Sequence, residues 1–175
     1  SPGCMGVEEL EAEADFANER AAMLYMGDWA AATFIQDNAP VSGKVVAMNF
    51  PSLADGKDPN AFLGGAIDTF MISANTEHPQ EAYQLLAYLS ENLGREGYLS
   101  GACLPAWKVE VPPDSINPLT QQIVELSQNA TGFMLAWDTF LEGADADTHL
   151  NAVAELFGGK SDGAAFAKAM ESINQ

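Results

Sequence analysis

The feature that most constrains the fold is an apolar run, residues 21–26, which ends abruptly at Gly27 and is followed by an indole. The run is apolar on both faces, as is typical of a short, fully buried strand. Gly27 permits a tight turn, Asp28 is a good helix N-cap, and the alanines after Trp29 favour a helix. The sequence therefore predicts a strand, a turn and a helix in direct succession, with Trp29 at the junction.

The junction combines chemical groups that suit a carbohydrate. Ligands of α/β proteins usually bind where a strand leads into a helix. The flat ring of Trp29 can stack on the C–H face of a sugar, while the Asp28 carboxylate and the backbone N–H groups near Gly27 take the hydroxyls. Our hypothesis is that Trp29 is the main stacking platform and that Asp28 accepts hydrogen bonds from the ligand.

The first part of the chain alternates helical and strand-like patterns. Residues 7–18 have the periodicity of an amphipathic helix. Residues 44–50 and 66–73 are rich in β-formers and are predicted as second and third strands. Between them, residues 51–63 are mostly turn formers, and Gly64-Gly65 opens the third strand.

The second part of the chain is helical. Pro79 starts a helix at its first turn, and residues 95–100 are predicted as a separate short helix. Apolar spacing predicts further helices around residues 116–126 and 150–157, and a last helix capped by Ser161. Together the two parts predict a helix-rich α/β fold.

The charge balance excludes two classes of partner. The 175 residues include 25 acidic and 7 basic side chains, which gives a net charge of −18 at pH 7. Such a surface repels nucleic acid phosphates and anionic lipids, but it does not affect neutral sugars. No apolar run approaches the roughly 18 residues that a membrane span needs. The first residues lack the basic and hydrophobic stretches of a signal peptide, so we expect the chain to be cut from something longer.

The cysteines and histidines do not predict catalysis or metal binding. Cys4 and Cys103 are too few for a disulfide scaffold; they either pair or, as we expect, stay free. His78 and His149 have no Cys or Ser placed as an activated nucleophile, and zinc ligands at workable spacing are lacking. We therefore expect no catalytic residue, metal or cofactor.

Two further patterns are similar to those of phosphate-binding and hydrolytic sites. Gly159-Lys160-Ser161 is similar to the end of a phosphate loop, but Ala154 stands where the first glycine is required. Asp28 and Asp138 are the candidates for the paired carboxylates of a glycoside hydrolase. No second motif supports hydrolysis, so this is the alternative reading.

Two other tryptophans join the candidate ligand residues. Trp137 directly precedes Asp138, so it too couples a ring to a carboxylate at an element boundary. Trp107 follows Leu104-Pro105 in a predicted loop.

Several motifs, taken in order, resemble one family. They are Phe16–Met23 leading to Gly27-Asp28-Trp29, Val45–Pro51, Phe62–Gly65 running to Ile72-Ser73, Pro79–Ala82, Pro105-Ala106, Trp137-Asp138, and Phe157–Ser161 with Met170. In this order and spacing the chain resembles the C-terminal half of an extracellular solute-binding protein of the sugar-binding, maltose-type class, which serves ABC importers.

The resemblance implies the helix-rich C-terminal portion of a two-lobed periplasmic-binding-protein-like (type II) fold. Residues 1–62 and 111–175 would belong to the C-terminal lobe, and residues 63–110 would cross to the other lobe. In the family, the tryptophan that matches Trp29 lines the sugar site. The glycine pair matching Gly64 and Gly65 lies at the crossing, and the segment matching Trp137 and Asp138 faces the cleft in many members.

The function implied is non-enzymatic capture of a sugar or oligosaccharide between two lobes and its presentation to membrane permease subunits. The location implied is extracellular or periplasmic, with a lipid anchor or secretion. Because the N-terminal half of the family pattern is absent, some strands would lack partners, and exposed edges invite a homodimer. The alternatives are a carbohydrate-active enzyme fragment and a structural or interaction domain without a small ligand.

Overall fold

The computed structural model describes residues 4–51, 58–64 and 68–173. The chain divides into two compact units, each of which is described by itself. Unit 1 consists of residues 1–8, 63–65 and 134–175, and unit 2 of residues 9–62 and 66–133. The lobe boundaries expected from the resemblance concern a whole two-lobed protein and stay a prediction.

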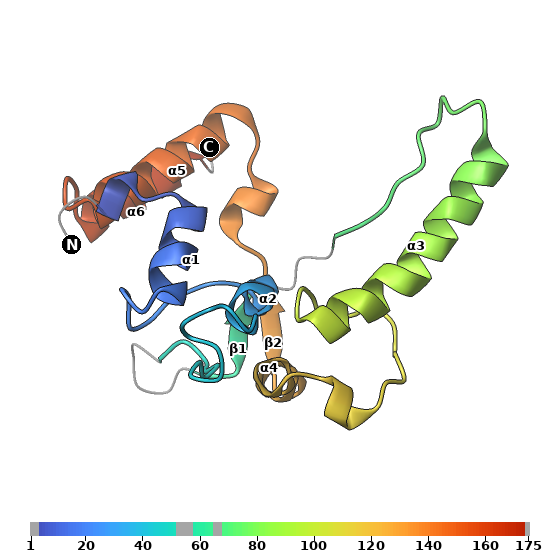
Figure 1. Ribbon diagram of the computed structural model, residues 1–175. Coiled ribbons are helices and arrows are strands. Elements are labelled where there is room, and N and C mark those ends of the chain that lie inside the picture. Colours follow the sequence, from blue (N-terminus) through green and yellow to red (C-terminus); the bar gives the residue numbers. More distant parts are fainter. Residues whose placement is uncertain (1–3, 52–57, 65–67, 174–175) are drawn as a thin grey trace. The chain divides into compact units, whose positions relative to one another are not determined.

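Unit 2 is built around a small helical core. Its first helices are α1 (Glu9–Ala17), the 3₁₀ helix η2 (Asp28–Ala30) and α2 (Ala31–Phe34), which follows η2 directly (Figure 1). The Phe34 ring packs edge-to-face on Phe16, with ring centroids 4.9 Å apart. The buried apolar residues of this core are Ala17, Ala30, Ala31, Phe34, Val41 and Leu119. The predicted helices at 7–18 and from Asp28 onward are therefore confirmed.

The longest helix, α3 (Pro79–Ser100), has 22 residues. Pro79 stands at its first turn, and Gly101 ends it in the left-handed conformation, φ 74°. The separate helix predicted at residues 95–100 is wrong, because Arg95 and Glu96 are good helix formers and nothing before Gly101 breaks the helix.

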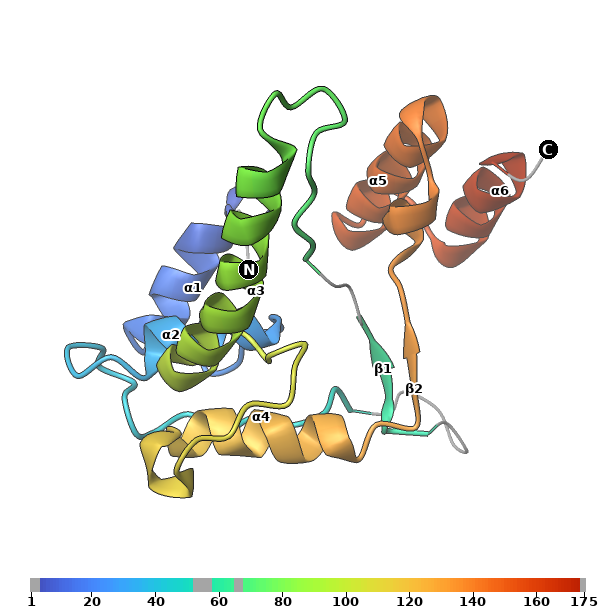
Figure 2. The ribbon, with the colours of Figure 1, turned by 90° about the vertical axis from the view of Figure 1, so that its right-hand side faces the viewer.

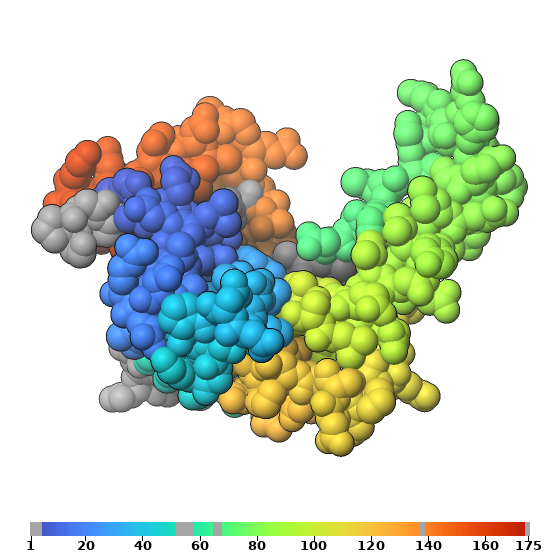
Figure 3. Space-filling view, viewed as in Figure 1, coloured from blue at the N-terminus to red at the C-terminus, as the bar shows by residue number. Residues whose placement is uncertain are grey.

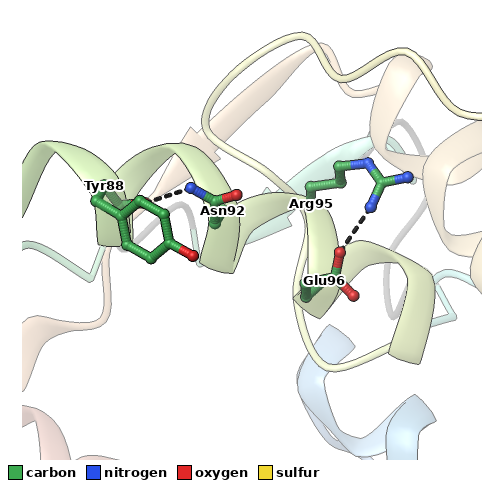
Figure 4. Close-up of polar contacts among 4 residues, drawn as sticks. All are labelled: Tyr88, Asn92, Arg95 and Glu96. Carbon is green, nitrogen blue, oxygen red and sulfur yellow. Dashed lines mark hydrogen bonds and ion pairs between the residues drawn. The ribbon is translucent and has the colours of Figure 1, made fainter.

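The polar contacts drawn on α3 are local (Figure 4). The Asn92 side-chain amide donates to the Tyr88 carbonyl at 2.8 Å, one turn earlier, and Arg95 pairs with Glu96 at 2.6 Å. Such exposed pairs contribute little to stability. Residues 68–75 and 77–81, before and at the start of α3, are all exposed, and Figure 3 shows this segment in green.

Helix α4 (Pro118–Gln128) confirms the helix predicted around residues 116–126. Its N-cap is Asn117, whose side-chain oxygen accepts the backbone N–H of Leu119 at 2.8 Å. Leu119 and Thr120 are buried in the first turn, so this end of α4 packs against the core of unit 2.

The described residues contain one two-stranded sheet, formed by β1 (Ala61–Leu63) and β2 (Gly132–Met134), which lie side by side in Figure 2. Thr131 donates to the Asn60 carbonyl at 3.0 Å, and Gly64 donates to the Met134 carbonyl at 2.9 Å, so the strands run in the same direction. The sequence did not predict these strands, since residues 51–63 are rich in turn formers.

The strands predicted at residues 21–26 and 44–50 are wrong, because these segments form no strand in the structure. Their side chains nevertheless alternate as a strand would require. Leu24, Met26, Val45 and Ala47 pack against the core. Met23, Tyr25, Val46, Met48 and Phe50 are exposed, and Met23 is 85% exposed. What these segments lack within the described residues is a neighbouring strand to complete the hydrogen-bond ladder.

The third predicted strand, residues 66–73, is described only from residue 68, and that part forms no strand either. Phe70 and Met71 are exposed there. Its apolar side chains therefore have no buried face among the described residues.

Unit 1 contains the helices α5 (Gly143–Phe157) and α6 (Gly163–Ile173), which pack on each other, and the short 3₁₀ helices η1 (Cys4–Gly6) and η4 (Trp137–Phe140). The predicted helix at 150–157 is confirmed and begins earlier than expected. Ser161 is not the cap of α6, because Asp162 Oδ1 accepts the Ala165 N–H at 2.9 Å. No helix in the described ranges is both long and apolar enough to cross a membrane.

Candidate functional site

Trp29 lies on the turn that opens η2. Gly27, just before it, has extended backbone angles (φ −78°, ψ 172°). A Cβ atom at Gly27 would overlap the six-membered ring of Trp29, so the indole folds back over the glycine backbone. The Trp29 side chain is 54% exposed, whereas the next two residues, Ala30 and Ala31, are buried in the core. The junction therefore presents an open aromatic ring on a firmly packed base.

Asp28 has a partner that sequence reasoning missed. Its Oδ2 accepts the backbone N–H of Leu104 at 3.0 Å, across 76 residues of sequence. This partly buried bond joins the Trp29 turn to the segment that follows α3. Asp28 Oδ2 is thus engaged within the protein, and Oδ1 is the oxygen that remains to contact a ligand.

Cys103, the residue before Leu104, is a free thiol of intermediate exposure. Burial raises the pKa of the Cys103 thiol, and the negative charges of Asp28 and Asp68 raise it further. The thiol therefore stays protonated at neutral pH and is a poor nucleophile. The expected free state of Cys103 is confirmed, while the side chain of Cys4 lies outside the described residues.

Trp107 lines a groove of its own, which is confined to unit 2. The groove has a volume of about 470 Å³ and lies between the end of α3, the segment after it, and α4. Its lining residues are Tyr98, Leu104, Pro105, Trp107, Lys108, Val109, Val124, Ser127 and Gln128. Trp29 is not among them, but Leu104 is, so the Asp28–Leu104 bond links the two tryptophan sites.

Of the residues that line this groove, only Trp107 was predicted from the sequence as a ligand-binding residue. The others come from three separate segments that meet only through packing. A partial signal existed in α4, where Val124, Ser127 and Gln128 have the i, i+3, i+4 spacing of a single helix face.

Gly64 follows β1 and has a φ of 133°, a conformation that a residue with a side chain rarely adopts. Its role at the crossing between lobes stays a prediction. Gly65 lies outside the described residues, and so do the side chains of Trp137 and Asp138, although η4 includes their backbone.

The sequence expectations concern two further kinds of chemistry, metal binding and glycoside hydrolysis. Within the described ranges, no group of three or more His, Cys, Asp or Glu residues is placed to hold a metal ion. The hydrolase alternative depends on the distance between the carboxylates of Asp28 and Asp138. The Asp138 side chain lies outside the described residues, so this alternative stays a prediction.

Comparisons with known proteins point to one class. Residues 8–94 match the family model described as bacterial extracellular solute-binding protein, which confirms the resemblance drawn from the sequence. The printed description of this family names extracellular bacterial proteins that bind solutes. A search of curated proteins found no match.

A solved structure shows the same fold. It comes from a study of xylan utilization by the thermophilic bacterium Caldanaerobius polysaccharolyticus, and its sequence is 36% identical. The match has a TM-score of 0.91 and covers 98% of this chain but 45% of that one. The present chain thus spans less than half the length of its solved relative. The helix-rich α/β fold expected as part of a type II periplasmic-binding-protein-like fold is confirmed.

Proposed function

We propose that the protein carrying this chain is the substrate-binding component of a carbohydrate ABC importer. It captures a sugar or oligosaccharide between two lobes and presents it to the permease subunits. The observation that carries this proposal is the exposed Trp29 ring on its glycine base, in a chain similar to extracellular solute-binding proteins. The xylan-utilization context of the solved relative supports carbohydrate as the ligand class.

The proposed roles follow from the environment of each residue. Trp29 stacks on the apolar face of a sugar ring, where C–H groups meet the negative face of the indole. The free oxygen of Asp28 accepts a hydroxyl hydrogen, and backbone groups near Gly27 complete the polar contacts. Trp137 and Asp138 contribute further ligand contacts from residues 111–175, the second part of the C-terminal lobe. Gly64 and Gly65 mark the crossing between lobes.

In this proposal the protein is not an enzyme. It is exported, and it is retained outside the cytoplasm by a lipid anchor or secreted freely. Calorimetric titration of the intact protein with xylan-derived and glucan-derived oligosaccharides, followed by product analysis, tests the function. Saturable binding without cleavage supports it. Cleavage of the sugar would instead establish the hydrolase alternative. No binding heat with any of the sugars would favour a domain without a small ligand.

We also propose that the 175-residue chain, produced alone, forms a homodimer. The exposed side chains of residues 23, 25, 46, 48 and 50 offer an apolar face beside backbone that no strand pairs among the described residues. Light scattering should show a dimer for the isolated chain and a monomer for a variant with Tyr25→Ser and Phe50→Ser. A wild-type chain that is monomeric at the same concentration would contradict this proposal.

A further inference from the structure

The Trp107 groove has an unusual charge for this protein. The chain carries 25 acidic and 7 basic side chains, yet none of the nine lining residues of the groove is acidic and one, Lys108, is basic. Among the described residues, no carboxylate lies within ion-pairing distance of Lys108, whereas Arg20, Lys44 and Arg95 each pair with one. The lining of the groove therefore carries a positive charge, although the chain as a whole is acidic.

The groove also offers an aromatic platform. Trp107 is 62% exposed, and Tyr98 lines the same space from the last turn of α3. Helix α4 adds two residues with polar side chains to the lining, Ser127 with a hydroxyl and Gln128 with an amide. Open rings beside a few polar side chains suit a sugar, since the ring takes the C–H face and the polar groups take the hydroxyls.

Local packing holds this platform in place. The backbone of Leu104 is fixed to Asp28, and a Cβ atom at Gly94 of α3 would lie 3.6 Å from Pro105 Cβ and 4.0 Å from Trp107 Cδ1. The segment that carries Trp107 and Lys108 thus packs directly on the helix. The volume of the groove, about 470 Å³, falls within the range of about 300–1,000 Å³ for small-molecule pockets.

We propose that this groove is a second ligand site, which binds a sugar bearing a carboxylate, that is, a uronic acid. The pyranose ring stacks on Trp107, and the carboxylate accepts hydrogen bonds from the Lys108 ammonium. Charge complementarity selects the acid over a neutral sugar, because Lys108 has no carboxylate partner within the described part of the chain. The proposal does not depend on the ligand of Trp29, since Trp29 does not line the groove.

The test uses the intact protein and two matched probes, glucuronic acid and glucose, which differ at the carboxylate. The indole N–H signals of the three tryptophans are followed by NMR and assigned with Trp→Phe variants. Glucuronic acid should shift the Trp107 signal saturably, with an affinity about tenfold higher than that of glucose. Lys108→Gln should remove this preference, and Lys160→Gln, which changes an exposed lysine of unit 1, should leave it intact.

Three results would overturn the proposal. They are a Trp107 signal that does not respond to millimolar glucuronic acid, equal affinities for the two probes in the wild type, and a preference that survives in Lys108→Gln. A short polyglutamate peptide that shifts Trp107 more strongly than glucuronic acid would assign the groove to acidic peptides instead. A Trp29 signal that does not respond to any sugar would contradict the proposed importer function and would leave the groove proposal unaffected. The two failures are therefore distinguishable.

Discussion

The Trp29 junction and the Trp107 groove use the same kind of side chain in opposite surroundings. Trp29 rests on the backbone of Gly27 and is followed by buried core alanines, and its neighbouring carboxylate points partly into the protein. Trp107 lies in a groove that has a lysine and no carboxylate. The difference teaches that a ring beside a carboxylate in sequence is not a ligand site by that fact alone, because the carboxylate can serve the fold.

The largest expected effect is a loss of stability when a buried ring at the base of the Trp29 junction is removed, in contrast to the removal of an exposed ring. Phe34 is 6% exposed and packs on Phe16, so Phe34→Ala should lower the free energy of unfolding by about 3–5 kcal/mol. Phe157→Ala is the matched control, since Phe157 is 72% exposed, and should cost less than about 1 kcal/mol. Urea denaturation measures both, and equal losses would show that the core has been placed wrongly.

The next effect concerns the bond between the two tryptophan sites. Asp28→Ala leaves the partly buried N–H of Leu104 without an acceptor, which should cost about 1–3 kcal/mol of stability. Asp28→Asn keeps an acceptor oxygen and should lose less. Amide hydrogen exchange at Leu104 should speed up in the alanine variant, and unchanged exchange there would mean that the bond does not hold this segment.

The helices were predictable because their signals are local. Pro79 and Gly101 delimit α3, and Asn117 caps α4, each by an interaction that spans a few residues. The error at the start of α6 is also local, because Ser161 and Asp162 are neighbouring residues that are both good N-caps. The structure uses Asp162, whose side chain accepts the Ala165 N–H.

The strands were not predictable in the same way. Residues 21–26 and 44–50 have the right apolar content, but a strand exists only with a hydrogen-bonding neighbour, which no local pattern specifies. The candidate site follows the same rule. The position of Trp29 on a turn was predicted from its own neighbours, and its ligand role stays a prediction. The contact with Leu104 and the lining of the Trp107 groove depend on segments far apart in sequence.

The smallest expected effect is a titration away from both tryptophans. The hydrogen bond from the Thr131 hydroxyl, together with one from the Asn60 backbone, lowers the pKa of Asp58 below its usual 3.8. A lowered folded-state pKa means that the stabilisation is present above the unfolded pKa and is lost as the pH falls through the folded value. Thr131→Val should move the Asp58 pKa back upward in an NMR titration; a pKa that stays where it was would show that Thr131 is not the cause.

The central claim is that Trp29 is the stacking platform of a sugar site that Trp107 does not share. Its most direct test is calorimetric titration of the intact protein with a neutral oligosaccharide, together with a melting temperature for each variant. We predict that Trp29→Ala weakens binding by about 2–4 kcal/mol, as for aromatic hot spots, with little change in melting temperature. Trp107→Ala should leave the affinity within about twofold, or roughly 0.4 kcal/mol. Unchanged affinity in Trp29→Ala, or a collapse of its fold, would contradict the account.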